Sequence, residues 1–262
     1  MKKVIIVGLL ASLGAILALA ACWTRTRRPA PTLQVFSGAG LMHPMDELCR
    51  AYSKKTGVNV QLSYGGTGML MGKLAAGQPC DVFIPGAAKY GDDAGRKGWV
   101  DSASVVAVVR HVPVLAVSTT GEAKVACLED LARPGVRVGL GDAKACAIGR
   151  TADLILERNG LADGAKSNVR IRTPTVNQLV VYLVMGQIDA AIVWEDMIRL
   201  PEASGKLRAV PIPPEKNLVS VIAASRGTRS EHPEQAADFM RFLASSQARE
   251  TWLKWGFAPC GG

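Results

Sequence analysis

The residues best suited to chemistry form a loop almost without side chains, residues 65–68 (Gly-Gly-Thr-Gly). Residues 58–64 before it alternate apolar and polar side chains, which predicts a strand, and residues 69–75 after it have apolar side chains at helical spacing. Glycines bring backbone N–H groups close to a bound group, and a helix begins with unpaired N–H groups at the positive end of its dipole. The loop therefore predicts an anion-binding site. Taken alone, it is equally compatible with a turn that binds nothing.

The same construction recurs along the chain. Residues 37–40 (Ser-Gly-Ala-Gly) follow a predicted strand at 33–36 and precede a helix that is expected to end near Gly57. Loops 141–149 and 173–177 also separate a predicted strand from a predicted helix. Consecutive parallel strands place such loops at the same carboxyl edge of a sheet. The recurrence therefore favours anion cradles that face a shared crevice.

The N-terminus carries a separate signal. Two lysines precede the uncharged run 4–21, which predicts a secretory signal peptide over residues 1–21. The run closes on Leu-Ala-Ala before Cys22, which resembles the lipobox of bacterial lipoproteins, so we expect Cys22 to be lipidated and residues 22–31 to form a linker. The alternative is a permanent transmembrane anchor, because the run is just long enough to span a bilayer. Both interpretations place the protein outside the cytoplasm and on a membrane.

Composition favours a binding module over other classes. The 262 residues are 48% hydrophobic and include 27 glycines, which suits an α/β protein with a large core. The formal charge of +9 falls to +4 without the two lysines of the signal peptide and the three arginines of the linker. No basic stripe with interleaved aromatic residues is present, so a nucleic-acid partner is not expected. No G-x-S-x-G, H-E-x-x-H or G-x-x-x-x-G-K-[ST] motif is present, so an enzyme is not expected either.

Two crossings between two lobes are predicted. A long apolar segment at 105–118 is interrupted by Pro113, as expected of a strand that passes from one domain to another. The chain returns near residues 210–218. We therefore predict lobe I from residues 32–112 plus 215–262 and lobe II from residues 113–214, with the ligand in the crevice between them.

The order and spacing of several short pieces resemble the substrate-binding proteins of molybdate and tungstate ABC transporters, the ModA-like family, over residues 33–258. The pieces are Val35-Phe36-Ser37-Gly38-Ala39-Gly40-Leu41, Tyr64-Gly65-Gly66-Thr67-Gly68, Gly77-Gln78-Pro79-Cys80-Asp81-Val82-Phe83-Ile84, Gly141-Asp142-Ala143, Ala190-Ala191-Ile192-Val193-Trp194 and Trp255-Gly256-Phe257-Ala258-Pro259. The resemblance implies a type II periplasmic-binding-protein fold, in which two parallel-sheet domains are joined by a crossing-strand hinge. It also implies a monomer that captures molybdate or tungstate and delivers it to an ABC permease, with no further cofactor.

The resemblance also implies which residues bind the oxyanion. In this family, serine hydroxyls in the first two loops, backbone N–H groups in the next two and a late tyrosine hydroxyl hold the anion without cationic side chains. These positions correspond here to Gly40, Thr67, Ile148, Val176 and Trp194. Thr67 keeps a hydroxyl and Trp194 offers an indole N–H, whereas Gly40 has no hydroxyl and Ser37 is the candidate to replace it. The expected ligand-binding residues are Ser37, Gly38, Ala39, Gly40, Gly66, Thr67, Gly68, Ile148, Val176 and Trp194.

Several alternatives stay open. Glu195 and Asp196 are candidate ligands for a cation, so the substrate could instead be a metal ion such as ferric iron, or another anion. A protein that presents its ligand to a membrane sensor would have the same fold and site. We interpret His111 as structural and Asp142 as a turn or cap residue. The pairing of the remaining cysteines is left open; they are Cys49, Cys80, Cys127, Cys146 and Cys260.

Overall fold

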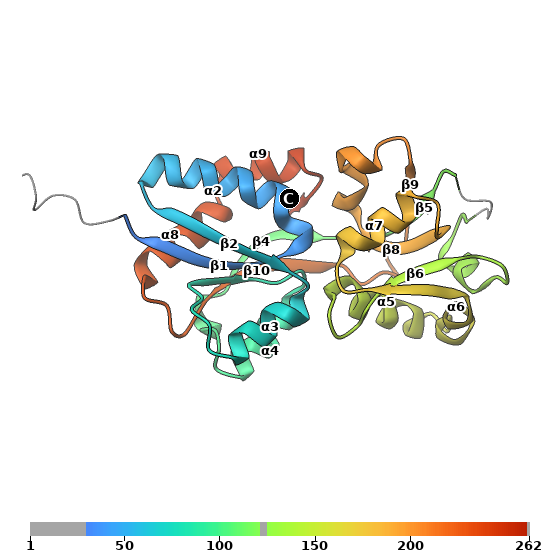
Figure 1. The fold of residues 1–262 in the computed structure, drawn as a ribbon, viewed down its shortest axis with the longest axis horizontal. Coiled ribbons are helices and arrows are strands. Elements are labelled where there is room, and N and C mark those ends of the chain that lie inside the picture. The colour runs from blue at the N-terminus through green and yellow to red at the C-terminus, as the bar shows by residue number, and fades with distance from the viewer. Residues whose placement is uncertain (1–29, 121–124, 261–262) are drawn as a thin grey trace, which may run out of the picture.

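The computed structural model describes residues 30–120 and 125–260, which form two α/β lobes lying side by side (Figure 1). The strands of lobe I are β1 (Thr32–Gly38), β2 (Asn59–Gly65), β3 (Val82–Ile84), β4 (Val106–His111), β10 (Ser220–Arg226) and β11 (Ala258–Pro259). Those of lobe II are β5 (Pro113–Ser118), β6 (Val138–Gly141), β7 (Val169–Thr173), β8 (Ala190–Trp194) and β9 (Leu207–Pro211). The signal peptide, the lipidated Cys22 and most of the linker, all predicted above, lie outside the described residues.

Helices cover both sheets. Lobe I contains α2 (Met42–Thr56), α3 (Thr67–Ala75), α4 (Ala88–Arg96), α8 (Pro233–Leu243) and α9 (Ser246–Lys254). Lobe II contains α5 (Ala147–Arg158), α6 (Ala162–Asn168) and α7 (Val176–Val184). Short 3-10 helices are η1 (Ala39–Leu41), η2 (Ser102–Ser104), η3 (Leu128–Ala132), η4 (Glu195–Arg199) and η5 (Pro201–Ala203). The predicted α/β class with two lobes is therefore confirmed.

Both sheets are mixed, which corrects the prediction of parallel sheets. The strand orders are β11-β4-β10-β3-β1-β2 and β7-β6-β8-β5-β9. β1 runs parallel to β2 and β3, and β6 runs parallel to β7 and β8, but β10 is antiparallel to β3 and β4, and β5 to β8 and β9. The antiparallel pairs involve the strands that carry the chain between the lobes, because β4 leads into β5 and β9 is followed by β10.

Alternate residues of β1 reach two different cores in lobe I. Val35 packs with residues of α2, α8 and α9, among them Met45 and Phe239, whereas Phe36 packs with Leu70 of α3. This alternation follows from the pleat, in which successive side chains point to opposite faces of the sheet. Lobe I therefore has helices on both faces of its sheet, as the ribbon shows (Figure 1). The result is a rigid support for the loops at the carboxyl ends of β1 and β2.

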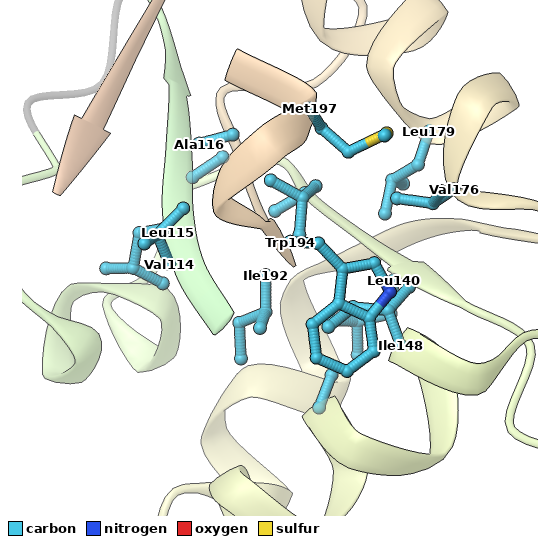
Figure 2. Packing of buried hydrophobic residues seen from close by; sticks show 14 of the residues in the cluster. Val114, Leu115, Ala116, Leu140, Ile148, Val176, Leu179, Ile192, Trp194 and Met197 are labelled. Carbon is cyan, nitrogen blue, oxygen red and sulfur yellow. The ribbon is translucent and has the colours of Figure 1, made fainter. Parts of the chain in front are cut away.

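The core of lobe II converges on the end of β8. Figure 2 shows side chains from β5, β8, α5 and α7 packed together around Ile192 and Trp194. Both residues are almost completely buried. The start of α5 differs from the prediction: the helix begins at Ala147, three residues before the expected Arg150, so that Ile148 lies in its first turn.

The two crossings are tied together at the hinge. Pro113 begins β5 and pairs with Trp194 in the antiparallel register of β5 and β8. The buried side chain of Asn217, on the return crossing, donates to the carbonyl oxygen of Pro113 (2.9 Å) and accepts from the N–H of Leu218 (2.8 Å). One side chain therefore joins both crossings.

We expect Asn217→Ala to destabilise the protein by about 1–3 kcal/mol, because the buried carbonyl of Pro113 loses its partner. In calorimetry this corresponds to a fall in melting temperature of about 2–4 °C per kcal/mol. Asn59→Ala, at the exposed start of β2, is the matched control and should change stability by less than about 0.5 kcal/mol. Equal losses in the two variants would contradict this role of Asn217.

Candidate functional site

A cavity of about 20 Å³ lies between the lobes. This volume admits one or two water molecules, so the closed arrangement suits a small, compact ligand. Most of the wall consists of backbone and small side chains. The lining residues are Gly38, Ala39, Gly40, Leu41, Gly65, Gly66, Thr67, Gly86, His111, Cys146, Ala147, Ile148, Thr175, Val176 and Trp194.

Four helical starts meet at this cavity. The segment of η1 and α2 follows β1, α3 follows β2, α5 follows β6, and α7 follows β7. In each case residues from the first turn or the cap line the cavity, including Thr67 of α3, Ile148 of α5 and Val176 of α7. The first N–H groups of a helix have no partner within the helix, and the helix dipole is positive at that end. The cavity is therefore surrounded by partial positive charge without any lysine or arginine among its lining residues.

Eight of the ten residues predicted to bind ligand line the cavity: Gly38, Ala39, Gly40, Gly66, Thr67, Ile148, Val176 and Trp194. Ser37 and Gly68 do not. Ser37 is fully buried in β1, and its hydroxyl has no hydrogen-bond partner among the described residues. The N–H of Gly68 already donates to the carbonyl oxygen of Ala145 (3.0 Å). The part of these two residues in ligand binding therefore stays a prediction.

Gly40 lies close to side chains of lobe II. A Cβ added at Gly40 would lie 3.1 Å from Cγ1 of Val176 and 3.5 Å from Cε of Met197. A side chain at this position would therefore need Val176 to move by a few tenths of an ångström. Figure 2 shows Val176 and Met197 in the cluster that also contains Trp194.

Thr67 and Trp194 supply side-chain donors. Thr67 is 2% exposed, and its hydroxyl oxygen accepts from the N–H of Gly86 (3.4 Å), which leaves the hydroxyl hydrogen available. Trp194 ends β8 within the core of lobe II, and its indole N–H is a donor only (Figure 2). Both side chains are held by packing in positions where they face the cavity.

His111 is the residue that sequence reasoning missed. It is 1% exposed and lines the cavity, and its ring stacks on Trp194 with centroids 3.8 Å apart. Its Nδ1 lies 2.9 Å from the carbonyl oxygen of Gly86, and its Nε2 lies 3.0 Å from Oδ1 of Asp196. One feature of the sequence could have indicated this role. His111 ends β4 two residues before Pro113, where the chain crosses between the lobes, and the ligand was expected between the lobes.

Of the candidate cation ligands, Asp196 is buried and Glu195 is exposed. Oδ1 of Asp196 lies 3.0 Å from Nε2 of His111, and the backbone N–H of Glu195 donates to the carbonyl oxygen of Val112 (2.8 Å). Within the part of the chain that the structure describes, no group of three or more His, Cys, Asp or Glu side chains is arranged to hold a metal ion.

Cys146 and Asp142 shape the third loop. Burial raises the pKa of the Cys146 thiol to about 11, so this cavity-lining group is uncharged near neutral pH. The Asp142 carboxylate accepts from the N–H groups of Ala145 (2.9 Å) and Lys144 (2.8 Å), which lower its pKa and confirm it as a turn residue. The five cysteines left open above are all free: Cys49, Cys80, Cys127, Cys146 and Cys260.

The lobes touch through backbone on one side of the cavity. A Cβ added at Gly66 would lie 2.3 Å from the carbonyl oxygen of Pro174, and one added at Gly68 would lie 2.2 Å from that of Lys144. Only glycine permits this approach, because any side chain would overlap the opposing backbone. The structure is therefore a closed form.

A second contact between the lobes joins α4 to the start of α5. Arg150 forms an ion pair with Asp93 (3.1 Å), and the hydroxyl of Tyr90 lies 3.4 Å from the carbonyl oxygen of Ala143. The guanidinium of Arg150 also lies over the ring of Tyr90. Arg150 and Asp93 are partly exposed, so their ion pair contributes little to closure.

No helix in residues 30–120 and 125–260 has both the length and the apolar character of a membrane span.

Comparison with known proteins agrees with this geometry. A Haemophilus influenzae protein, named provisionally as a binding protein, is 28% identical over 238 residues, which cover 88% of this chain and 92% of that protein. The molybdate-binding protein ModA of Mycobacterium bovis is 22% identical over 231 residues, 87% of this chain and 85% of its own. The solved Azotobacter vinelandii periplasmic molybdate-binding protein superposes with a TM-score of 0.76 at 19% identity, over 87% of this chain and 100% of that one.

These likenesses extend over both lobes, and the solved neighbour has the type II periplasmic-binding-protein fold that the resemblance implied. The family of bacterial extracellular solute-binding proteins matches residues 33–258, nearly all of the described chain. Members of this family bind solutes for ABC transporters outside the cytoplasm and are not enzymes. A cavity between two lobes, lined by helix starts, is the feature such a protein needs, and this chain belongs to the bacterial extracellular solute-binding protein family.

Proposed function

We propose that this protein captures a small tetrahedral oxyanion and delivers it to an ABC permease. Molybdate and tungstate are the first candidates for this anion. The observation that carries the proposal is the meeting of four helical starts at one small cavity. A tetrahedral oxyanion presents acceptors in all directions, which matches donors that arrive from both lobes. The small volume and the glycine-rich wall disfavour larger organic solutes.

The donors suffice for tight binding without a lysine or arginine. A hydrogen bond to a charged group is worth roughly 1.5–3 kcal/mol net, and a helix start contributes up to about 2 kcal/mol in a partly buried site. In the proposed complex, the hydroxyl of Thr67, the indole N–H of Trp194 and backbone N–H groups near Gly40, Ile148 and Val176 donate to the anion. After the cost of immobilising the ligand and closing the lobes, affinities between micromolar and nanomolar are expected, on the order of −8 to −12 kcal/mol.

The proposal includes the N-terminal segment and the partners. In it, residues 1–21 are a signal peptide and lipidated Cys22 anchors a monomer to the membrane through the linker at 22–31. The permease receives the anion when the lobes open. The names of the molybdate-binding relatives support this ligand class. The alternative ligands are other anions and ferric iron, and the alternative partner is a membrane sensor; binding measurements distinguish the ligands.

Calorimetry on residues 32–262 should show binding of molybdate and tungstate at micromolar affinity or tighter, with weaker binding of sulfate and phosphate. The expected order follows the ligand named for the molybdate-binding relatives, and the four oxygen atoms of a tetrahedral anion accept from donors on both lobes. Ferric iron and a neutral sugar serve as controls and should give no heat of binding. Binding of ferric iron alone would contradict the proposed ligand class, although it would leave the family unchanged.

Thr67→Val should weaken binding of molybdate about tenfold or more, because it removes one hydroxyl donor to a charged ligand at nearly constant shape. Thr251→Val in α9, far from the cavity, is the matched control and should bind as the wild type does. An unchanged affinity in Thr67→Val would exclude this hydroxyl as a donor.

Gly68→Ala should weaken binding of molybdate at least tenfold, because the added Cβ would overlap Lys144 and keep the lobes apart. X-ray scattering with saturating ligand should then report a larger radius of gyration than for the wild type. Gly72→Ala in the same helix is the control, since a Cβ there has no atom within 4 Å. If Gly68→Ala closes and binds normally, the backbone contact is not needed for capture.

A further inference from the structure

Both ring nitrogens of His111 face oxygen atoms. The partner of Nδ1 is the carbonyl oxygen of Gly86 (2.9 Å), which only accepts, so Nδ1 carries a proton. The partner of Nε2 is Oδ1 of Asp196 (3.0 Å), and two atoms without a proton would repel each other at that distance. One proton therefore lies between His111 and Asp196. The pair is either an imidazolium with a carboxylate or a neutral imidazole with a carboxylic acid, and its total charge is zero in both forms.

The surroundings act on these two forms in opposite directions. The ring of His111 stacks on the indole of Trp194 at an interplanar angle of 16°, and an aromatic face stabilises a cation. The second oxygen of Asp196, Oδ2, is buried without a partner, which penalises the ionised carboxylate. The first contact favours the imidazolium and the second favours the neutral form. A charge in the cavity lies next to this ring and adds a third influence on the position of the proton.

Few other titratable groups face His111. Phe257 and Trp194 contribute uncharged rings, and Ser220 is its neighbour on β10. The neighbouring Arg110 is exposed, as expected for the opposite face of β4. In the cavity wall, the thiol of Cys146 is neutral. Among the residues that the structure places around the ring, Asp196 is thus the titratable partner.

We propose that the His111–Asp196 pair makes the cavity selective for dianions over monoanions of the same shape. When a dianion is bound, the shared proton lies on Nε2, so that a positive imidazolium faces the ligand and the negative charge sits behind it on Asp196. His111 is the group that faces the ligand, and Asp196 is a positioning residue. The inference rests on the proposed function, since it names the charge that the same site prefers.

Tungstate and perrhenate provide the test, because both are tetrahedral tetraoxo anions of nearly equal size but carry charges of −2 and −1. Calorimetry should show that Asp196→Asn lowers the preference for tungstate over perrhenate at least tenfold, with perrhenate affinity changed less than threefold. The reason is that the amide donates to Nε2 and leaves His111 neutral. Asp92→Asn, at an exposed position of α4, removes the same charge and should keep the wild-type ratio.

Nitrogen-15 NMR gives a readout that a merely structural role would not change. The chain has three histidines, His43, His111 and His232, so His43→Gln and His232→Gln assign the signals of His111. With tungstate bound, both ring nitrogens of His111 should be protonated, and in Asp196→Asn only Nδ1 should be. A wild-type complex with an unprotonated Nε2 would overturn the inference.

The two proposals fail in different ways. If the wild type binds neither anion, the proposed function is overturned, and the charge selectivity falls with it. If the wild type binds tungstate but Asp196→Asn weakens both anions by the same factor, only the charge selectivity is overturned. His111→Gln, which has no ionisable ring, should reproduce the loss of preference, and an unchanged ratio in that variant would also overturn the inference.

Discussion

The meeting of the two lobes depends on a backbone contact at glycine positions, where no side chain intervenes. Gly66 and Gly68 of lobe I meet the carbonyl groups of Pro174, Lys144 and Ala145 of lobe II at distances that no side chain permits. This approach brings the helix starts of the two lobes to opposite sides of one cavity. Without it, each lobe would present its N–H groups to water, where hydrogen bonds to solvent compete with those to a ligand. The glycines of the predicted anion-binding loop are therefore also the glycines that allow the two lobes to meet.

The charge around the cavity comes from backbone dipoles, which do not titrate, and, in the proposed mechanism, from His111, whose charge varies. Helix dipoles and N–H groups contribute partial positive charge that does not titrate. The thiol of Cys146 is neutral, so it does not oppose them. In the proposed dianion selectivity, His111 adds a group whose charge depends on where a single proton lies between it and Asp196. An anion site built in this way needs no lysine or arginine, which would hold its charge whether or not a ligand was present.

Patterns of short range made much of the fold predictable. Strand-loop-helix units, the capping glycine Gly57 and the break at Pro113 are local signals, and the structure contains each of them, although α5 begins three residues earlier than expected. The direction of β10 was not predictable from such signals, because it depends on the path of the chain back from lobe II. The prediction of parallel sheets was therefore wrong for the strands next to the crossings, because the strand-loop-helix pattern gives the direction only of the strands within each such unit.

The site was predictable to the extent that it is made of backbone. Loops at the ends of parallel strands of one sheet converge for topological reasons, and Ile148 and Val176 lie together as a consequence. Thr67 belongs to the other sheet and joins them only because the two lobes meet. Contacts between side chains from distant parts of the chain were not accessible in the same way. His111 and Asp196 are 85 positions apart, and nothing in the sequence near either residue indicates the other. The full burial of Ser37 was not predictable for the same reason, since it depends on both of its neighbouring strands.

The most direct test of the central claim is the position of tungsten in crystals grown with tungstate, located by its anomalous scattering. The claim predicts a single strong peak between the lobes, with oxygen atoms about 3 Å from the hydroxyl of Thr67 and from the N–H groups of Ile148 and Val176. A tungsten peak only on the outer surface of a lobe, or an interlobe cavity that stays without tungsten at saturating concentration, would contradict it.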